Sequence, residues 1–265
     1  MSARPVGEVT RGTTNPNRLR RVDRWLAAVQ APRLRRPGPA PIVVDLGYGR
    51  TGTTTRELHE RLRAVRPDVE VVGLEIEPTR VAAARPLERP GLRFALGGFE
   101  VPLPGERRAS LIRAFNVLRQ YDERAVGRAW ARMSERLEPD GVLVEGTCDE
   151  LGRLATWVWL EAAGPVGFTI SVGLRGLERP SDVAPRLPKV LINRNVPGEP
   201  VHDWLRALDD AWARSAPLAA YGRRQRFIAT VERVRAAGWP VVGGRSRWRV
   251  GEVSVRWEAV APAAR

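Results

Sequence analysis

Three glycines and two carboxylates between residues 45 and 75 have the types and spacing of a nucleotide-binding site. They are Asp45, Gly47, Gly49, Gly52 and Glu75. Glycine permits tight turns and lets the backbone approach a ligand closely, because it has no Cβ. A carboxylate about twenty residues beyond such a loop can accept hydrogen bonds from the hydroxyls of a ribose. The pattern therefore predicts that this stretch binds a ligand that contains a ribose.

The residues around these glycines predict the elements that must position them. Residues 42–45 and 69–75 are mostly apolar runs that each end in an acid, which indicates two buried strands. Between them, Leu58, Leu62 and Val65 recur at helical spacing. A strand, a glycine loop, a helix and a second strand predict a βαβ unit. The N-terminus of its helix would offer unpaired N–H groups to the ligand.

Composition excludes several classes of protein. The chain has 265 residues, which is enough for a sizeable core, and no apolar run is long enough to span a membrane. Its first residues lack the apolar segment of a secretion signal. The one cysteine, Cys148, excludes intrachain disulfides, and with only His59 and His202 beside it no metal site is predicted. We therefore expect a cytoplasmic protein.

Positive charge is concentrated outside the predicted ribose site. Nine arginines and two acids give residues 1–40 a net charge of +7. Residues 41–150 carry 17 arginines and 18 acids, and residues 151–265 carry 18 basic and 10 acidic residues. This distribution favours an anionic partner such as RNA, a nucleotide or a phosphorylated metabolite. A solvated basic surface, or the arginine bias of a GC-rich genome, would give the same counts.

The first 40 residues form a predicted basic arm and helix. Asn15-Pro16 is a typical helix start, and four apolar residues follow on one face: Leu19, Val22, Leu26 and Val29. The arginines of this segment point elsewhere: Arg18, Arg20, Arg21 and Arg24. The helix either docks on the sheet or recruits an anion. It could also hold Arg11, Thr13 and Thr14 over the bound ligand.

The second half of the chain predicts an insertion followed by the end of the fold. Residues 155–174 contain two β-rich runs around Gly164-Pro165, and the proline-punctuated residues 179–200 are predicted to be irregular. Helices are expected at about 200–214 and 221–237, and residues 252–260 alternate as an antiparallel strand does. Trp157 and Trp159 share a face of the first run, where they either stack on an aromatic group or pack in the core.

Several segments together resemble the class I S-adenosylmethionine (SAM) methyltransferases. Asp45 precedes Gly47 as in the D-x-G-x-G loop of that family, and VVGLEIEPTRVAAAR (71–85) resembles its second motif. LRFALGGFEVPLP (92–104) resembles the third strand and the turn beside the adenine. Residues 110–121 resemble the fourth strand and its loop, and residues 128–147 resemble the helix, turn and fifth strand. The resemblance spans residues 40–150, resumes at 200–260, and is greatest to an actinobacterial branch.

The resemblance implies the fold, the cofactor and its binding residues. The fold would be an α/β, Rossmann-like, seven-stranded methyltransferase sheet with an antiparallel terminal strand, an N-terminal basic helix and an insertion after strand five. The segments would be a basic arm (1–40), a SAM-binding half (41–150), an insertion or lid (151–200) and the C-terminal part of the fold (201–265). The residues implied to bind SAM are Asp45, Gly47, Tyr48, Gly49, Gly52, Glu75, Ile76, Gly98, Phe99 and Asn116.

The candidates for catalysis are Asn116, Tyr121 and Cys148. NVLRQY (116–121) lies where amino-methylating enzymes of nucleic acids carry an asparagine and two prolines. Both prolines are missing, so methylation of a base amine is not supported, although Asn116, Arg119 and Tyr121 could line an acceptor pocket. Thr147-Cys148 resembles the catalytic pair of RNA cytosine-C5 methyltransferases. The neighbouring acids would raise the pKa of this thiol rather than lower it.

The sequence thus predicts a SAM-dependent methyltransferase, and the acceptor stays open. An anionic or aromatic small molecule is favoured slightly over RNA, because no RNA-binding module accompanies the catalytic segment. An NAD(P)-dependent oxidoreductase is an alternative that the glycine spacing permits. The chain has no Tyr-x-x-x-Lys pair, since Lys189 is its one lysine. A catalytically silent SAM-binding protein is the third possibility.

Overall fold

The computed structural model describes residues 4–10 and 15–263. The residues predicted to cover the ligand, Arg11, Thr13 and Thr14, lie outside this range. The chain divides into two compact units. Unit 1 contains residues 1–152 and 160–164, and unit 2 contains residues 153–159 and 165–265. Most of the predicted insertion and all of the predicted C-terminal segment therefore fall in unit 2.

A parallel sheet of five strands forms the centre of unit 1. Its strands are β1 (Ile42–Leu46), β2 (Glu70–Glu75), β3 (Leu92–Leu96), β4 (Ala109–Phe115) and β5 (Leu137–Cys148). They lie in the order β3-β2-β1-β4-β5, and each neighbouring pair is parallel. The strand order reverses between β1 and β4, and open α/β sheets bind ligands at the carboxyl ends of strands at such a point. The predicted α/β, Rossmann-like architecture is confirmed.

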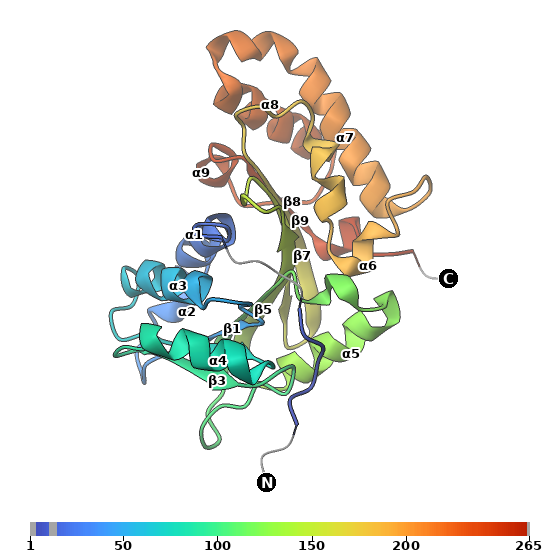
Figure 1. The fold of residues 1–265 in the computed structure, drawn as a ribbon. Coiled ribbons are helices and arrows are strands. Elements are labelled where there is room, and N and C mark those ends of the chain that lie inside the picture. The colour runs from blue at the N-terminus through green and yellow to red at the C-terminus, as the bar shows by residue number, and fades with distance from the viewer. Residues whose placement is uncertain (1–3, 11–14, 264–265) are drawn as a thin grey trace. The chain divides into compact units, whose positions relative to one another are not determined.

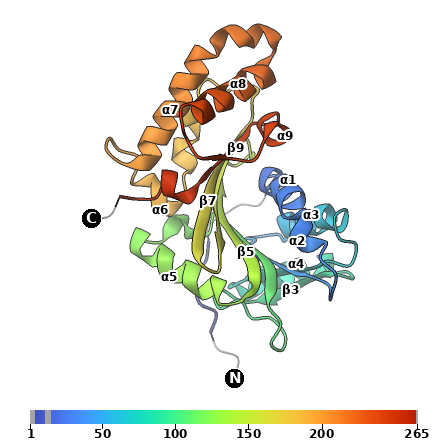
Figure 2. The ribbon, with the colours of Figure 1, turned by 180° about the vertical axis from the view of Figure 1, so that it is seen from behind.

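Helices cover both faces of this sheet, which explains why its central strands are apolar runs. Helices α3 (Thr53–Arg63) and α4 (Pro78–Ala84) lie on one face, and α5 (Glu123–Ser134) lies on the other (Figures 1 and 2). Helix α1 (Arg20–Val29) packs against α3, and the short α2 (Ala31–Leu34) follows it. Single turns η1 (Arg85–Leu87) and η2 (Leu118–Gln120) follow α4 and β4.

The N-terminal helix begins later than its sequence predicts. Residues 15–19 form a turn, and α1 starts at Arg20. Asn17 has a left-handed φ of 60°, and its N–H donates to both carboxylate oxygens of Glu57 on α3. This tertiary contact replaces the helix start predicted at Asn15-Pro16. Val29, predicted to face inward, is 43% exposed.

Unit 2 contains a second group of strands. These are β6 (Leu154–Glu161, whose last two residues belong to unit 1), β7 (Gly164–Val172), β8 (Val241–Val242) and β9 (Glu252–Arg256). Strand β9 pairs antiparallel with both β7 and β8, as expected for the terminal strand. Strands β6 and β7 confirm the two predicted β-rich runs. The described residues therefore form nine strands, where the sequence predicts seven.

Helices α7 (Pro200–Arg214) and α8 (Arg223–Ala236) lie side by side in unit 2, with η4 (Ala216–Tyr221) between them in the chain (Figure 2). Helix α9 (Arg245–Trp248) packs against α8. No helix in the described ranges combines the length and the apolar composition needed to cross a membrane.

Two predictions about unit 2 are wrong. Residues 179–200 are not irregular, because they contain the helical turns η3 (Pro180–Arg186) and α6 (Lys189–Ile192). Pro180 is the first residue of η3, where its fixed φ suits a helical turn, and Pro188 is the N-cap of α6. The terminal strand is shorter than predicted, since β9 ends at Arg256 and η5 (Trp257–Ala259) follows.

Candidate functional site

The turn between β1 and α3 has the backbone that its glycines predict. Gly47, Gly49 and Gly52 have φ values of 70°, 82° and 31°, in the left-handed region that other residues rarely adopt. A Cβ on Gly47 would lie 2.6 Å from Val117 Cγ2, and one on Gly52 would lie 2.7 Å from Phe94 Cε1. Glycine is therefore required at these two positions by conformation and by packing together.

Asp45, near the end of β1, is held by Arg113 of the adjacent strand β4. Arg113 Nε donates to Asp45 Oδ1 at 2.9 Å, and Arg113 Nη2 donates to Oδ2 at 2.6 Å. The Thr55 hydroxyl on α3 donates to Oδ2 at 2.7 Å. All three residues are buried. The acid predicted to face the methionine end of SAM thus has both carboxylate oxygens engaged by the protein, in the bidentate arrangement that favours arginine.

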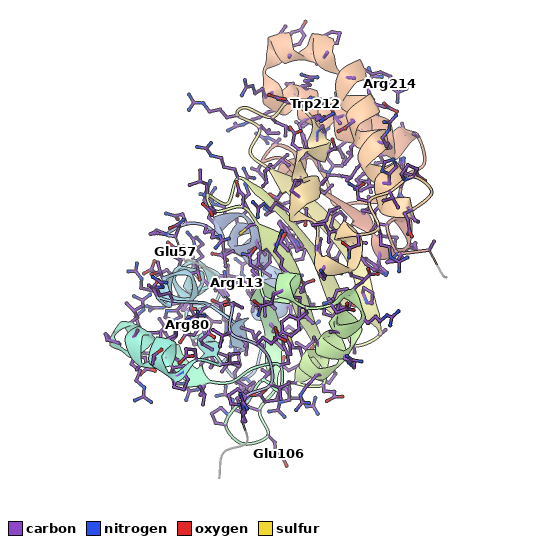
Figure 3. The ribbon with its side chains drawn as sticks, turned by 45° about the vertical axis from the view of Figure 1, so that its right-hand side comes forward. Glu57, Arg80, Glu106, Arg113, Trp212 and Arg214 are labelled. Carbon is purple, nitrogen blue, oxygen red and sulfur yellow. The ribbon has the colours of Figure 1, made fainter. Side chains whose placement is uncertain are left out.

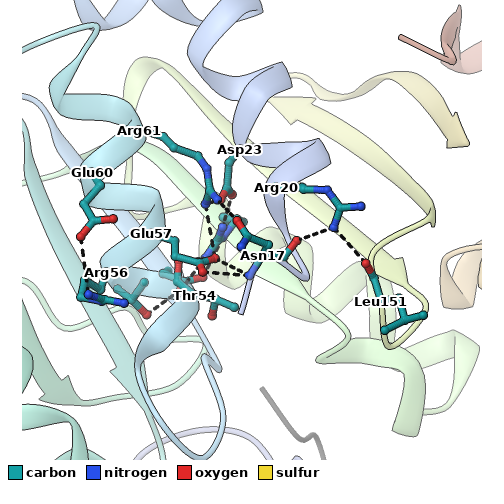
Figure 4. Close-up of polar contacts among 12 residues, drawn as sticks. Asn17, Arg20, Asp23, Thr54, Arg56, Glu57, Glu60, Arg61 and Leu151 are labelled. Atoms are coloured by element: carbon teal, nitrogen blue, oxygen red, sulfur yellow. Dashed lines mark hydrogen bonds and ion pairs between the residues drawn. The ribbon is translucent and has the colours of Figure 1, made fainter. Parts of the chain in front are cut away.

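The same guanidinium continues the network to α1. Arg113 Nη1 donates to Asp23, whose other oxygen accepts from Arg61 Nη1 at 2.6 Å. Arg61 also donates to the Asn17 side chain at 2.7 Å. Figure 4 shows Arg61 between Asp23 and Asn17. A chain of charged contacts therefore joins the start of the N-terminal helix to Asp45 at the glycine loop.

Burial and ion pairing both shift the pKa values of Asp23 and Arg113. Burial raises the pKa of Asp23 to about 6, although Arg113 and Arg61 oppose the rise. Burial alone would lower the pKa of Arg113, but Asp45 and Asp23 outweigh it and raise that pKa above its usual range. Arg113 therefore stays charged. Two guanidiniums, those of Arg113 and Arg61, thus match the two carboxylates of Asp23 and Asp45.

Glu75 ends β2, where a ribose-binding acid is predicted. Its Oε2 accepts from the backbone N–H of Gly49 at 3.0 Å, and its Oε1 accepts from that of Ile76 at 2.9 Å. Arg80 on α4 places Nη1 3.5 Å from Oε2. Both Arg80 and Arg113 are labelled in Figure 3. Glu75 is buried. Its two backbone hydrogen bonds link the glycine loop to the turn after β2.

An open pocket of about 430 Å³ lies at the carboxyl ends of β1 and β4. It is lined by Thr10, Arg18, Leu19, Asp45, Leu46, Gly47, Tyr48, Gly49, Thr54, Phe115 and Asn116. Among these described residues Arg18 is the one cation, and its Nε donates to the carbonyl oxygen of Asp149 at 3.1 Å. The pocket thus carries a positive group on one side and the Asp45 network on another.

A second cavity, of about 250 Å³, adjoins the first and shares Thr10, Leu46 and Gly47 with it. Its other lining residues are Val6, Gly7, Glu8, Glu75, Ile76, Gly97, Gly98, Phe99, Val117 and Tyr121. Every residue predicted to bind SAM, apart from Gly52, lines one of the two cavities. Gly52 contributes through the packing of the loop against Phe94. These placements agree with the predicted roles and do not test binding itself.

Asn116 and Cys148 engage each other after strands β4 and β5. The Cys148 N–H donates to Asn116 Oδ1 at 3.0 Å, and Asn116 Nδ2 lies 3.3 Å from Cys148 Sγ. Asn116 has a left-handed φ of 60°, which asparagine tolerates better than most residues. Burial raises the pKa of the Cys148 thiol, and Cys148 lines neither cavity. These features do not favour a nucleophilic cysteine.

Tyr121 is separated from the other two candidates. It lines the second cavity, its ring centroid lies 5.3 Å from that of Phe99, and its hydroxyl accepts from the Glu8 N–H. Burial raises its pKa. The three catalytic candidates do not converge on one point. Within the described ranges, no group of three or more His, Cys, Asp or Glu side chains is placed to hold a metal ion.

Arginines of the N-terminal segment are engaged in docking. Arg18 donates to the Asp149 carbonyl, Arg20 to that of Leu151 at 3.0 Å, and Arg21 to that of Gly152 at 3.1 Å. Figure 4 includes the contact from Arg20 to Leu151. These guanidiniums satisfy the turn that follows β5, which is the docking role considered from the sequence.

The paired tryptophans belong to the core of unit 2. Trp157 is fully buried and Trp159 is 9% exposed. A Cβ on Gly167 would lie 2.2 Å from the Trp159 ring, so the strand beside it must carry glycine there. The packing interpretation of this pair is confirmed, and neither ring offers a surface on which a base could stack.

Sequence reasoning missed Arg113 and Asp23. Arg113 interrupts an apolar run in β4, and Asp23 lies on the buried side of α1. A charge inside an otherwise buried element requires an opposite charge beside it, because an unpaired buried charge is very costly. A charged residue inside an apolar segment indicates a buried ion pair, but the sequence does not show which residue is its partner.

Among the comparisons with known proteins, only the search of solved structures found matches to this chain. No protein-family model matches the sequence, and no curated protein matches it. The cyclopropane synthase MmaA2 from Mycobacterium tuberculosis is 24% identical over 46% of this chain and 41% of that chain, with a TM-score of 0.34. The mitomycin 7-O-methyltransferase MmcR is 22% identical over 49% and 40%, with a TM-score of 0.34.

A third similar structure is the plantazolicin methyltransferase BamL, solved in complex with a triazolic desmethylPZN analog and S-adenosylhomocysteine (SAH). It is 13% identical over 50% of this chain and 46% of that chain, with a TM-score of 0.38. This chain spans less than half the length of each of these solved structures. Identities this low concern the fold and not the activity.

Proposed function

We propose that this chain is a SAM-dependent methyltransferase of the class I type, acting in the cytoplasm. One observation carries the proposal. The glycine loop follows β1, Glu75 ends β2 and Asn116 follows β4. These residues line two adjoining cavities at the point where the strand order reverses. Open α/β sheets bind nucleotide-like ligands at this position.

The polar groups of the two cavities fit the parts of SAM. Glu75 is placed to accept hydrogen bonds from ribose hydroxyls. The methionine end of SAM carries an ammonium and a carboxylate. The Asp45 carboxylate, which lines the first pocket, suits the ammonium, and Arg18 suits the carboxylate. Opposite charges at separate points of one pocket favour a zwitterion over a simple anion.

SAM, when bound, supplies a methyl group on a sulfonium, and the protein needs to do little covalent work. The chain's own residues hold the cofactor, orient the acceptor and exclude water. Asn116, whose backbone φ is fixed in the left-handed region at the edge of the first pocket, is the residue we place beside the acceptor. A general base is needed only if the acceptor must lose a proton.

We propose a small-molecule acceptor, anionic or aromatic. RNA has less support, because Arg20 and Arg21 donate to main-chain carbonyls of the turn after β5. The basic residues of unit 2 are the other candidates for recruiting an anion.

Calorimetric titration of the purified chain with SAH and, separately, with NADH tests the cofactor. Binding of SAH without NADH supports the proposal. Binding of NADH alone would favour the oxidoreductase alternative. SAH binding without transfer of a labelled methyl group to any acceptor in a panel of aromatic and anionic small molecules and RNA would favour a catalytically silent protein.

A further inference from the structure

The chain's own N-terminal residues lie against the turns that follow β2, β3 and β4. We call residues 6–10 the strap (dark blue, near the N-terminus in Figure 1). The Val6 carbonyl accepts from the Phe99 N–H at 2.9 Å, and the Glu8 N–H donates to the Tyr121 hydroxyl. Arg80 Nη2 donates to the Thr10 carbonyl at 2.7 Å. The strap is therefore held along its whole length.

The strap lines the second cavity, to which Val6, Gly7, Glu8 and Thr10 contribute. Its Val6 carbonyl accepts from the N–H of Phe99, one of the residues expected beside an adenine, and a Cβ on Gly98 would lie 2.0 Å from the same carbonyl oxygen. A purine that accepts from the Phe99 N–H must displace the Val6 carbonyl, because that N–H has one hydrogen to donate.

Glu75 is also occupied while the strap is seated. A carboxylate has about four acceptor positions. Glu75 uses three of them, for the N–H groups of Gly49 and Ile76 and for Arg80. A ribose that presents two hydroxyls needs two positions, so one contact must yield. The 3.5 Å contact of Arg80 is the longest of the three, and Arg80 also holds Thr10 through two contacts.

We infer that the strap is a built-in competitor for the adenosyl part of the cofactor, and that Arg80 couples strap release to the freeing of Glu75. This inference rests on the proposed function. The binding-competent state is the one with the strap displaced. The apparent dissociation constant for SAH is then raised as the fraction of molecules with a displaced strap falls.

Hydrogen–deuterium exchange on the full chain tests the competition directly. Saturating SAH should speed exchange of the amides of Val6 and Glu8, because the ligand and the strap exclude each other. Slower or unchanged exchange in this segment, with SAH bound, would overturn the inference. It would show that the strap closes over the cofactor or is independent of it.

Gly98→Ala tests the seating of the strap without any ligand. A Cβ on Gly98 would lie 2.0 Å from the Val6 carbonyl oxygen, and Gly98 has no left-handed φ of its own. The variant should therefore speed exchange of residues 6–10. Gly127→Ala is the matched control, since no atom lies within 4 Å of the added Cβ. Unchanged exchange in Gly98→Ala would contradict the seated position of the strap.

Tyr121→Phe tests the effect on affinity. It removes the hydroxyl that accepts from the Glu8 N–H and keeps the ring against Phe99. The SAH dissociation constant should fall by about two- to tenfold, the range for one hydrogen bond lost from the competing state. Tyr221→Phe, at a residue 77% exposed in unit 2, should change nothing.

The two proposals fail in different ways. If neither the wild-type chain nor Tyr121→Phe binds SAH, the cofactor assignment is wrong and the competition falls with it. If both bind SAH and Tyr121→Phe binds it equally or more weakly, the cofactor assignment stands and the competition is overturned.

Discussion

Arg113 on β4 grips both carboxylate oxygens of Asp45 on β1, with Nε–Oδ1 and Nη2–Oδ2 distances of 2.9 and 2.6 Å. The pair is buried at the carboxyl end of the central strands, under the glycine loop. Asp45 therefore contributes to the stability of the fold through its ion pair with Arg113. Mutations of Asp45 are expected to change stability as well as ligand binding.

Asp45→Ala should lower the free energy of unfolding by about 3–5 kcal/mol, because it leaves the Arg113 guanidinium buried with one partner fewer. The double variant Asp45→Ala/Arg113→Leu should lose less than the sum of the two single changes. Urea unfolding of the three variants measures this. Glu60→Ala, at a half-exposed carboxylate, should stay within about 0.5 kcal/mol of the wild type. Additive losses at Asp45 and Arg113 would show that the pair is not coupled.

Stability should fall as pH rises because of Glu145, a fully buried residue of β5. Burial raises its pKa from 4.5 to about 8, with Trp130 opposing the rise. Between these values the unfolded chain has lost the proton and the folded chain retains it, so each pH unit costs at most about 1.4 kcal/mol. Glu145→Gln should remove this dependence. We would compare the pH profiles of thermal unfolding for the two chains from pH 5 to 8, and parallel profiles would exclude the assignment.

Glu75→Ala should weaken SAH by about 1.5–3 kcal/mol, the range for hydrogen bonds to a charged group. Glu77 provides the matched control. It caps α4, with its carboxylate accepting from the Thr79 N–H at 3.4 Å, and it lines neither cavity. Glu77→Ala should therefore cost stability, about 1 kcal/mol for a lost cap, and leave SAH affinity unchanged. If Glu77→Ala weakened SAH binding and Glu75→Ala did not, the ribose would be bound by Glu77 and not by Glu75.

Arg18→Gln should weaken SAH by about 1.5–3 kcal/mol and leave binding of 5′-methylthioadenosine unchanged, because that molecule lacks the amino-acid end. Comparing two ligands on one variant separates a lost contact from general damage to the pocket. Arg24→Gln, at an exposed arginine of α1, serves as the control. If Arg18→Gln weakened the binding of SAH and of 5′-methylthioadenosine equally, Arg18 would support the pocket only through its hydrogen bond to Asp149 and would not contact the ligand.

Local signals made the glycine loop predictable. Gly47 and Gly52 are dictated by backbone conformation within a few residues, and Glu75 follows from the position at which an apolar run ends. The βαβ order then determines which strand ends meet. Nine of the ten cofactor residues that the family resemblance implies line the two cavities.

Contacts between distant residues could not be predicted in this way. Asp23 and Arg113 are 90 positions apart, and Glu8 and Tyr121 are 113 apart, so no local pattern links them. Asn17 shows how such a contact overrides a local rule. The segment has good helix-start residues, but the Glu57 carboxylate binds the Asn17 N–H and moves the start of α1 to Arg20.

The most direct test of the proposed function is a calorimetric titration of SAH into the wild-type chain, Gly47→Ala and Gly105→Ala. Both glycines have a left-handed φ, of 70° and 61°, so the backbone cost of alanine is matched. Only at Gly47 would the added Cβ clash with a neighbour, the Val117 side chain. Gly47 lines both cavities. We predict one SAH per chain for the wild type and Gly105→Ala, and no binding for Gly47→Ala. Absence of SAH binding to the wild type would contradict the proposed function, and equal binding to all three would contradict the placement of the cofactor at the glycine loop.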